Sequence, residues 1–283
     1  MFSRQTLAGA LRGGNRRGAG ARSPRPMKAF RLNRLFAASS RRCLAVAVGH
    51  GSEDPARTVR ALSDAAPDAL QLSIGQAALL QSIPGKGRPA LILRADVANV
   101  RGNALPPNLF SRTIGNAVEQ AVRLDAACVM ASLIQIPGEP ALTAQCVENI
   151  ARLEPACERF AMPLMIELLI LRPSAQGDGD AEKILPLIRQ ARDLGADLIQ
   201  TDAAACHRVM ESAGGIPVLV RVGGAASDAE ILGRAESCIR QGAAGLVDDG
   251  NLPQHPDPAG LTRALMAVVH DGATTAAAVQ FIG

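Results

Sequence analysis

Glu167, Asp96 and His50 are the residues of this sequence best suited to acid–base chemistry. Glu167 lies inside an apolar run, whereas Asp96 and His50 each follow one. Because an unpaired buried carboxylate is costly, we expect Glu167 to face a partner, either a substrate or one of Arg94 and Arg221. Asp96 fits either proton transfer or an ion pair with Arg94, and His50 fits either a pocket wall or a turn contact.

Glycines and histidines elsewhere give weaker signals. Gly223 and Gly224 permit a close approach between the backbone and a ligand, although a tight turn would also explain them. His207 and His270 lie in helix-like segments and are expected on the surface or in packing contacts. The six cysteines form no CxxC pair and lie near no histidine at metal-ligand spacing. We therefore predict no metal and no cofactor.

The composition argues against several classes of function. Only 2% of the residues are aromatic, with no Trp and no Tyr, so base-stacking platforms are scarce. The basic charge is concentrated in residues 1–42, and the remaining chain is mildly acidic. No apolar run approaches the ~20 residues of a membrane span. We expect no nucleic-acid or membrane partner, and scattered reduced thiols favour a cytoplasmic location.

Eight short apolar runs predict the strands that would position these residues. Their near-continuous hydrophobicity is typical of strands buried on both faces of a parallel sheet. Their spacing predicts a single (β/α)₈ TIM barrel, with a doubly wound open sheet as the alternative. In such a barrel the site lies at the carboxyl ends of the strands. The runs are 44–48, 69–73, 90–94, 127–133, 164–170, 197–200, 217–221 and 244–247.

Amphipathic segments between these runs predict the surrounding helices. Ser227 and Asp228 provide a favourable N-cap for one of them, and a terminal glycine ends it. The clearest helical segments are 111–125, 143–160, 180–195 and 229–242.

Residues 1–27 are predicted to be a disordered basic extension, and residues 28–283 the barrel domain. The extension is rich in Arg, Gly and Ala, and its first 26 residues contain no acid. It also fits a transit peptide or a basic tail. Alternatively, Met27 is the true first residue, because patterned sequence begins directly after it.

The ordered motifs of the chain resemble class I aldolases of the archaeal/bacterial fructose-bisphosphate type. The motifs are RLNRLF, AVAVGHG, GADLIQTD, PVLVRVGG, GAAGLVDDGNLPQHPDP and ALMAVVHDGAT. They are also similar to the autoinducer-2 thiolase/aldolase group, within the deoxyribose-phosphate/tagatose-bisphosphate aldolase superfamily. The resemblance covers about residues 28–283.

This resemblance implies a lyase that forms a Schiff base with a ketone substrate. A lysine after the sixth strand would form the imine, at the position of Gln200. An Asp after the first strand would handle protons, at the position of Gly49. The glycines Gly223 and Gly224 and a Gly-Arg-Asn motif would hold a phosphate.

The sequence departs from the family pattern at three of these places. An amide nitrogen is delocalised into its carbonyl, so Gln200 cannot form an imine. Gly49 replaces the Asp, and Asp249, Gly250 and Asn251 stand where Gly-Arg-Asn is expected. Asp248 precedes them, so the guanidinium is exchanged for nearby carboxylates, which repel a phosphate. Asn251 and His255 keep the family pattern, or only cap a short helix.

We therefore expect an aldolase-family protein whose Schiff-base catalysis is impaired or altered. The alternative is a non-catalytic barrel that binds a ligand or an oligomer partner, and a third possibility is acid–base chemistry without an imine. The expected ligand is a phosphorylated sugar or a related keto compound, bound near Arg221, and the family implies a homo-oligomer. Of the three lysines, Lys28 and Lys86 belong to the opposite rim, and Lys183 begins a solvated helix.

Overall fold

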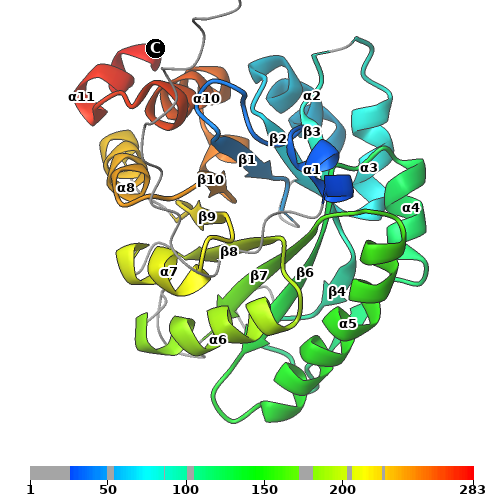
Figure 1. Ribbon diagram of the computed structural model, residues 1–283. Helices are drawn as coiled ribbons and strands as arrows, with labels where there is room; N and C mark the ends of the chain where they lie inside the picture. Colours follow the sequence, from blue (N-terminus) through cyan, green and yellow to red (C-terminus); the bar gives the residue numbers. More distant parts are fainter. Residues whose placement is uncertain are drawn as a thin grey trace, which may run out of the picture.

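Eight parallel strands close into a barrel that is surrounded by helices (Figure 1). The computed structural model describes residues 26–49, 54–85, 87–100, 105–171, 181–202, 206–224 and 227–283. The strand order around the barrel is β1-β10-β9-β8-β7-β6-β3-β2. The single (β/α)₈ barrel is thereby confirmed, and the open doubly wound sheet is excluded. The barrel strands are β1 (Cys43–Ala47), β2 (Ala69–Leu72), β3 (Ala90–Arg94), β6 (Cys128–Gln135), β7 (Leu164–Ile170), β8 (Leu198–Asp202), β9 (Val218–Arg221) and β10 (Gly245–Asp248).

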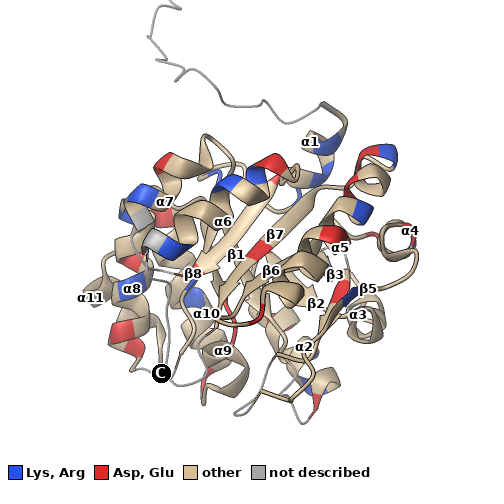
Figure 2. Ribbon diagram, turned by 90° about the horizontal axis from the view of Figure 1, so that it is seen from below, with Lys and Arg blue, Asp and Glu red and all other residues tan. Residues whose placement is uncertain are grey.

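Each of the eight predicted apolar runs overlaps a barrel strand, with ends displaced by two residues or fewer. The prediction succeeds because both faces of each strand are buried. One face contributes to the barrel interior and the other packs under the helices. Figure 2 shows the charged residues mainly on the outer helices, with few on the strands.

The helices cover the outside of the barrel. In α8 (Asp228–Arg240), the predicted N-cap Ser227 donates its backbone N–H to Glu230 at 2.8 Å in a capping box. Within the described residues, no helix is long and apolar enough to cross a membrane. The other outer helices are α2 (Pro55–Ala65), α3 (Ile74–Gln81), α4 (Ala117–Arg123), α5 (Pro140–Arg159), α6 (Ala181–Asp193), α7 (Cys206–Ala213), α9 (Asn251–Gln254), α10 (Pro258–Met266) and α11 (Thr275–Ala278), with a π-helix at Ala267–Asp271 and a 3-10 helix at Val279–Phe281.

The helix predicted for residues 111–125 is wrong at its beginning. Ser111–Thr113 forms the short strand β5, which pairs antiparallel with β4 (Asp96–Ala98), and the helix α4 starts only at Ala117. Side chains of α5 stabilise this strand, since the Asn149 Oδ1 accepts from the backbone N–H of Thr113 at 3.3 Å. A tertiary contact of this kind overrides the local helical pattern.

The helix α1 (Pro26–Leu32) and the turn after it close the amino-terminal end of the barrel. Leu32 and Leu35 are 6% and 0% exposed and pack with the lower interior residues of the strands. The Lys28 Nζ lies 2.7 Å from both Glu158 and Asp197. Most of the predicted extension 1–27 lies outside the described residues, while Pro26 and Met27 begin α1.

Candidate functional site

A cluster of charged and amide side chains centred on Glu167 lies within the barrel toward the carboxyl ends of the strands. Glu167 is 2% exposed. Its Oε2 accepts from the Arg94 Nη2 and the Ser132 Oγ, both at 2.9 Å. Its Oε1 accepts from the Arg221 Nη2 and the Gln200 Nε2, both at 3.1 Å. The predicted pairing of Glu167 with an arginine is therefore observed with both candidates.

The register of neighbouring strands brings these side chains together. Glu167 on β7 lies opposite Ser132 on β6 and Gln200 on β8. Because side chains alternate along a strand, Asp202 shares the inward face of β8 with Gln200. Asp202 is in turn opposite Arg221 on β9.

Gln200 is held by hydrogen bonds on both sides of its amide. It is 1% exposed, and its Nε2 donates to Glu167. Its Oε1 accepts from the Gln71 Nε2 on β2 at 2.6 Å, across the barrel interior. The Gln71 Oε1 is buried and has no hydrogen-bond partner among the described residues.

Asp96 is paired with Arg94, as one of the two predictions for it required. The Arg94 Nη1 lies 3.3 Å from the Asp96 Oδ1, and the Asp96 Oδ2 accepts from the Ser132 N–H at 2.7 Å. Burial raises the pKa of Asp96, and Arg94 only partly opposes that shift. Burial would lower the pKa of Arg94, but the nearby Glu167 and Asp96 outweigh it and the net shift is upward. The described contacts favour a structural role for Asp96.

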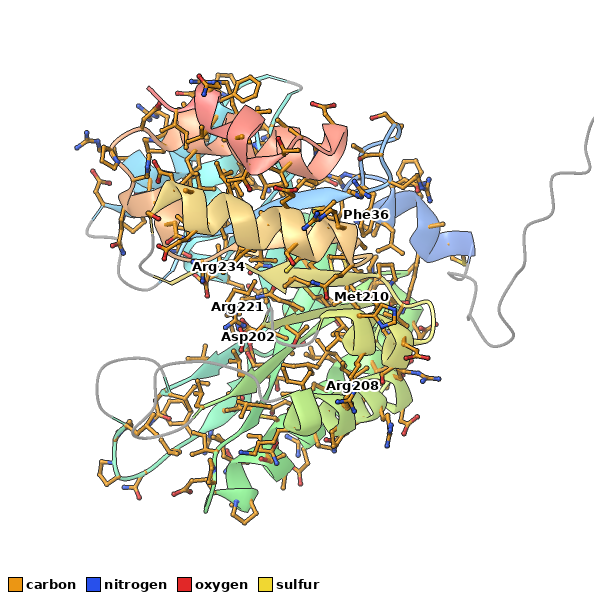
Figure 3. All side chains as sticks on the ribbon, turned by 90° about the vertical axis from the view of Figure 1, so that its left-hand side faces the viewer. Phe36, Asp202, Arg208, Met210, Arg221 and Arg234 are labelled. Atoms are coloured by element: carbon orange, nitrogen blue, oxygen red, sulfur yellow. The ribbon has the colours of Figure 1, made fainter. Side chains whose placement is uncertain are left out.

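Arg221 connects Glu167 to two further carboxylates. Its Nη1 lies 3.2 Å from the Asp202 Oδ1, and its Nε lies 3.3 Å from the Asp249 Oδ2. The three carboxylates raise the pKa of Arg221 although burial opposes them. Asp202 and Arg221 lie beside each other, far from Phe36 at the α1 end of the barrel (Figure 3). The guanidinium is thus bound to groups of the chain itself.

The space beside Gly223 is filled by the side chain of Asp249. A Cβ at this position would overlap the Asp249 Oδ1, so a larger residue would require the Asp249 carboxylate to move. Gly224 has a φ of +108°, a left-handed conformation that favours glycine. The group that closely approaches the backbone at Gly223 is therefore the Asp249 carboxylate and not a ligand. The role of Gly223 and Gly224 in ligand binding stays a prediction.

The Asp248 carboxylate accepts three hydrogen bonds at the start of α9. It is 0% exposed and accepts from the Leu252 N–H at 2.9 Å, the Asn251 Nδ2 at 2.8 Å and the Gly250 N–H at 3.3 Å. Burial nevertheless raises the pKa of Asp248. The groups expected to bind phosphate at Gly250 and Asn251 are thus directed toward an internal carboxylate.

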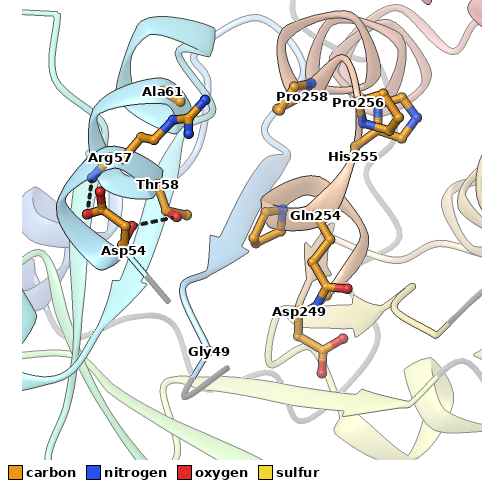
Figure 4. Close-up of a pocket in the computed structure, with 12 residues that line it drawn as sticks. Gly49, Asp54, Arg57, Thr58, Ala61, Asp249, Gln254, His255, Pro256 and Pro258 are labelled. Carbon is orange, nitrogen blue, oxygen red and sulfur yellow. Dashed lines mark hydrogen bonds between the residues drawn. The ribbon is translucent and has the colours of Figure 1, made fainter. Parts of the chain in front are cut away.

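Two cavities meet at Gly49 and Asp249. The mouth of the barrel is its open end at the carboxyl ends of the strands. A small polar niche of about 40 Å³ lies there and is lined by Gln71, Glu167 and Gln200, among others. A larger pocket of about 770 Å³ lies between α2 and the α9–α10 region. Figure 4 shows Arg57 of α2 and His255 after α9 on its two sides.

The His255 Nδ1 accepts from the Asp257 N–H, and its Nε2 contacts Asp228 at 3.1 Å.

The remaining predicted residues lie away from the cluster or outside the described residues. His50 and Lys86 belong to segments that the structure does not describe. Lys28 lies at the closed end, as predicted for the opposite rim. Lys183 is exposed and lines a groove of about 790 Å³ beside α5. Neither described lysine lines the niche.

Gln71 and Ser132 belong to the cluster, but the sequence analysis did not select them. A single polar residue inside each of two apolar runs, ALQLS and ACVMASL, was the available signal. Neither run shows which residue lies across the barrel. The contact between Gln71 and Gln200 joins positions 129 residues apart.

Comparisons with known proteins agree with this architecture. The chain is 28% identical over 269 residues to the 2-amino-3,7-dideoxy-D-threo-hept-6-ulosonate synthase of Halobacterium salinarum, covering 90% of this chain and 96% of that protein. It is 28% identical over 268 residues to the 3-hydroxy-5-phosphonooxypentane-2,4-dione thiolase of Salmonella paratyphi A, covering 88% and 84%. The crystal structure of an archaeal fructose 1,6-bisphosphate aldolase superposes with a TM-score of 0.72 and 24% identity, covering 87% of this chain and 100% of that one.

A family model described as DeoC/LacD family aldolase matches residues 26–248. This segment includes nearly all of the barrel, from α1 to the end of β10. The chain therefore belongs to the DeoC/LacD family of aldolases.

Proposed function

We propose that this protein is an aldolase-family barrel, by descent a carbon–carbon lyase, that no longer captures its ligand as a Schiff base. It would bind a sugar-type or related keto compound at the mouth without a covalent bond. The observation that carries the proposal is Gln200, locked between Gln71 and Glu167 at the position where the resemblance implies a lysine.

The chemistry of the amide supports this proposal. Imine formation needs a nucleophilic amine, and a lysine in a protein site provides one when its pKa is lowered. A related archaeal fructose-1,6-bisphosphate aldolase, 21% identical, has been solved with its catalytic lysine covalently bound to a carbinolamine intermediate. In the present chain Lys28 is held by two carboxylates at the closed end, and Lys183 lies on α6.

The carboxylates at the mouth also weigh against ordinary phosphate binding. Asp249 occupies the space beside Gly223, and Asp248 accepts the hydrogen bonds at the start of α9. Gly250 stands where the Gly-Arg-Asn pattern would supply an arginine, so these two carboxylates have no such positive charge beside them. A phosphate placed there would meet like charges.

Borohydride trapping tests the proposal directly. Incubation with dihydroxyacetone phosphate and sodium borohydride, followed by intact-protein mass spectrometry, should give no added mass. The positive control is the combined variant Gly49→Asp, Gln200→Lys, Asp249→Gly and Gly250→Arg, which restores the family pattern. A reduced adduct on a lysine of the unmodified protein would refute the proposal.

A non-catalytic role is the second candidate, because Arg94 and Arg221 are paired with carboxylates of the chain itself. The protein would then bind a ligand or associate with further copies in the cytoplasm. An assay for retro-aldol release of dihydroxyacetone or its phosphate separates the two candidates. Turnover that Glu167→Gln abolishes would favour surviving acid–base catalysis.

Light scattering of the purified protein would test the expected homo-oligomer.

A further inference from the structure

We infer that the mouth selects an uncharged polyhydroxy compound over its phosphate ester, and that the Gln71 Oε1 is the acceptor for a ligand hydroxyl. The inference rests on the proposed non-covalent binding at the mouth and names the class of ligand for that site. It assigns the recognition atom to β2, on the opposite side of the niche from the family's lysine position.

The orientation of both amides follows from Glu167. An ionised carboxylate only accepts hydrogen bonds, so Gln200 must present its Nε2 to Glu167. Its Oε1 then faces Gln71, at 2.6 Å from the Gln71 Nε2. Turning either amide alone would place two oxygens or two N–H groups against each other. The chain of contacts therefore leaves the Gln71 Oε1 as an acceptor with no donor among the residues that the structure describes.

The side chain that carries this acceptor forms part of the wall of the niche. Gln71 is 4% exposed, and it lines the niche of about 40 Å³. A buried polar atom without a partner has lost its hydrogen bonds to water without compensation, so a donor at this point gains more than an ordinary exposed contact. The niche has room for about one water-sized group. A hydroxyl fits both the volume and the need for a donor.

The charge around the niche disfavours anions. Around the niche, Glu167, Asp202 and Asp249 outnumber Arg94 and Arg221. Among the residues that line the larger pocket, Asp54 and Asp249 outnumber Arg57. A phosphate ester would therefore bind against a net negative potential.

The larger pocket provides space for the rest of the ligand. It shares Gly49 and Asp249 with the niche and has a volume of about 770 Å³. Asp54 and Thr58 of α2 and Gln254 of α9 line it and supply further polar groups. A polyhydroxy chain can thus place one hydroxyl at Gln71 and the others along these side chains.

A matched pair of probes tests the inference on the full chain. Binding of D-fructose and of D-fructose 1-phosphate is measured by calorimetry at low ionic strength, since the chain has no Trp or Tyr for fluorescence. D-Fructose should bind at least tenfold more tightly, and added salt should reduce the difference. Gln71→Leu should weaken D-fructose binding roughly five- to tenfold. Gln81→Leu, at the exposed end of α3, is the matched control.

A second variant keeps the test independent of how Gln71→Leu folds. Asp249→Asn removes one negative charge next to Arg221 and should shift the affinity ratio toward the phosphate ester. Equal or tighter binding of the ester by the unmodified protein overturns the inference, as does unchanged D-fructose binding in a folded Gln71→Leu variant. Failure of both probes to bind also overturns it. Borohydride labelling would instead refute the proposed function, so the two failures are distinguishable.

Discussion

The buried Glu167 pairs with two partly buried guanidinium groups, so its removal should destabilise the barrel strongly. Glu167→Ala leaves Arg94 and Arg221 without their shared partner, and breaking a buried pair costs about 3–5 kcal/mol. Urea unfolding followed by far-ultraviolet circular dichroism measures the loss. Glu148→Ala is the control, because Glu148 and Arg152 form an exposed pair worth at most about 1 kcal/mol. Equal losses in the two variants would contradict the account of the cluster.

Two buried carboxyls should make the stability of the protein depend on pH. Burial raises the native pKa of Asp96 and Asp248 above the ordinary value near 3.8. Between that value and the raised pKa the native state binds more protons than the unfolded chain, so these groups contribute stability that is lost as pH rises. The free energy of unfolding of the wild type, relative to Asp248→Asn, should therefore increase on acidification from neutral pH toward pH 4. A pH-independent difference would show that Asp248 is not perturbed.

At the scale of elements, α1 acts as the floor of the barrel. A chain that lacks residues 1–25 keeps Lys28, Leu32 and Leu35, and its free energy of unfolding should match that of the full chain. A chain that lacks residues 1–36 loses both buried leucines, each worth roughly 1.5–3 kcal/mol. We expect it to be destabilised by more than about 4 kcal/mol or to fail to fold. Equal unfolding midpoints for the two truncations would contradict this role of α1.

The strands could be predicted from sequence because their burial on both faces leaves a local signal. The short pair β4–β5 could not, because Ser111–Thr113 acquires its conformation from contacts with Asp96–Ala98 and with α5. The candidate site divides in the same way. The pairing of Glu167 with Arg94 and Arg221 follows from the cost of a buried charge. The contact of Gln71 with Gln200 depends on barrel closure, which no local pattern records.

At the scale of the whole molecule, the charge is unevenly distributed along the chain. The formal net charge is +4, from 30 basic and 26 acidic residues. Residues 1–25 contain six arginines and no acid, so their removal leaves 24 basic residues against 26 acidic ones. The truncated protein should therefore have an acidic isoelectric point, and isoelectric focusing should show the reversal. A basic isoelectric point for the truncated chain would contradict this charge count.

The packing of Leu32 and Leu35 under the strands has a consequence for how molecules enter and leave the barrel interior. Among the described residues that end is closed, so a molecule bound inside would enter and depart at the carboxyl ends of the strands. Two molecules held in line would have to leave in reverse order of depth, the outer one first. The pocket between α2 and α10 shares Gly49 and Asp249 with the niche. A molecule bound in that pocket would therefore delay escape from the niche, and the lifetime of the deeper molecule would lengthen as the outer position fills.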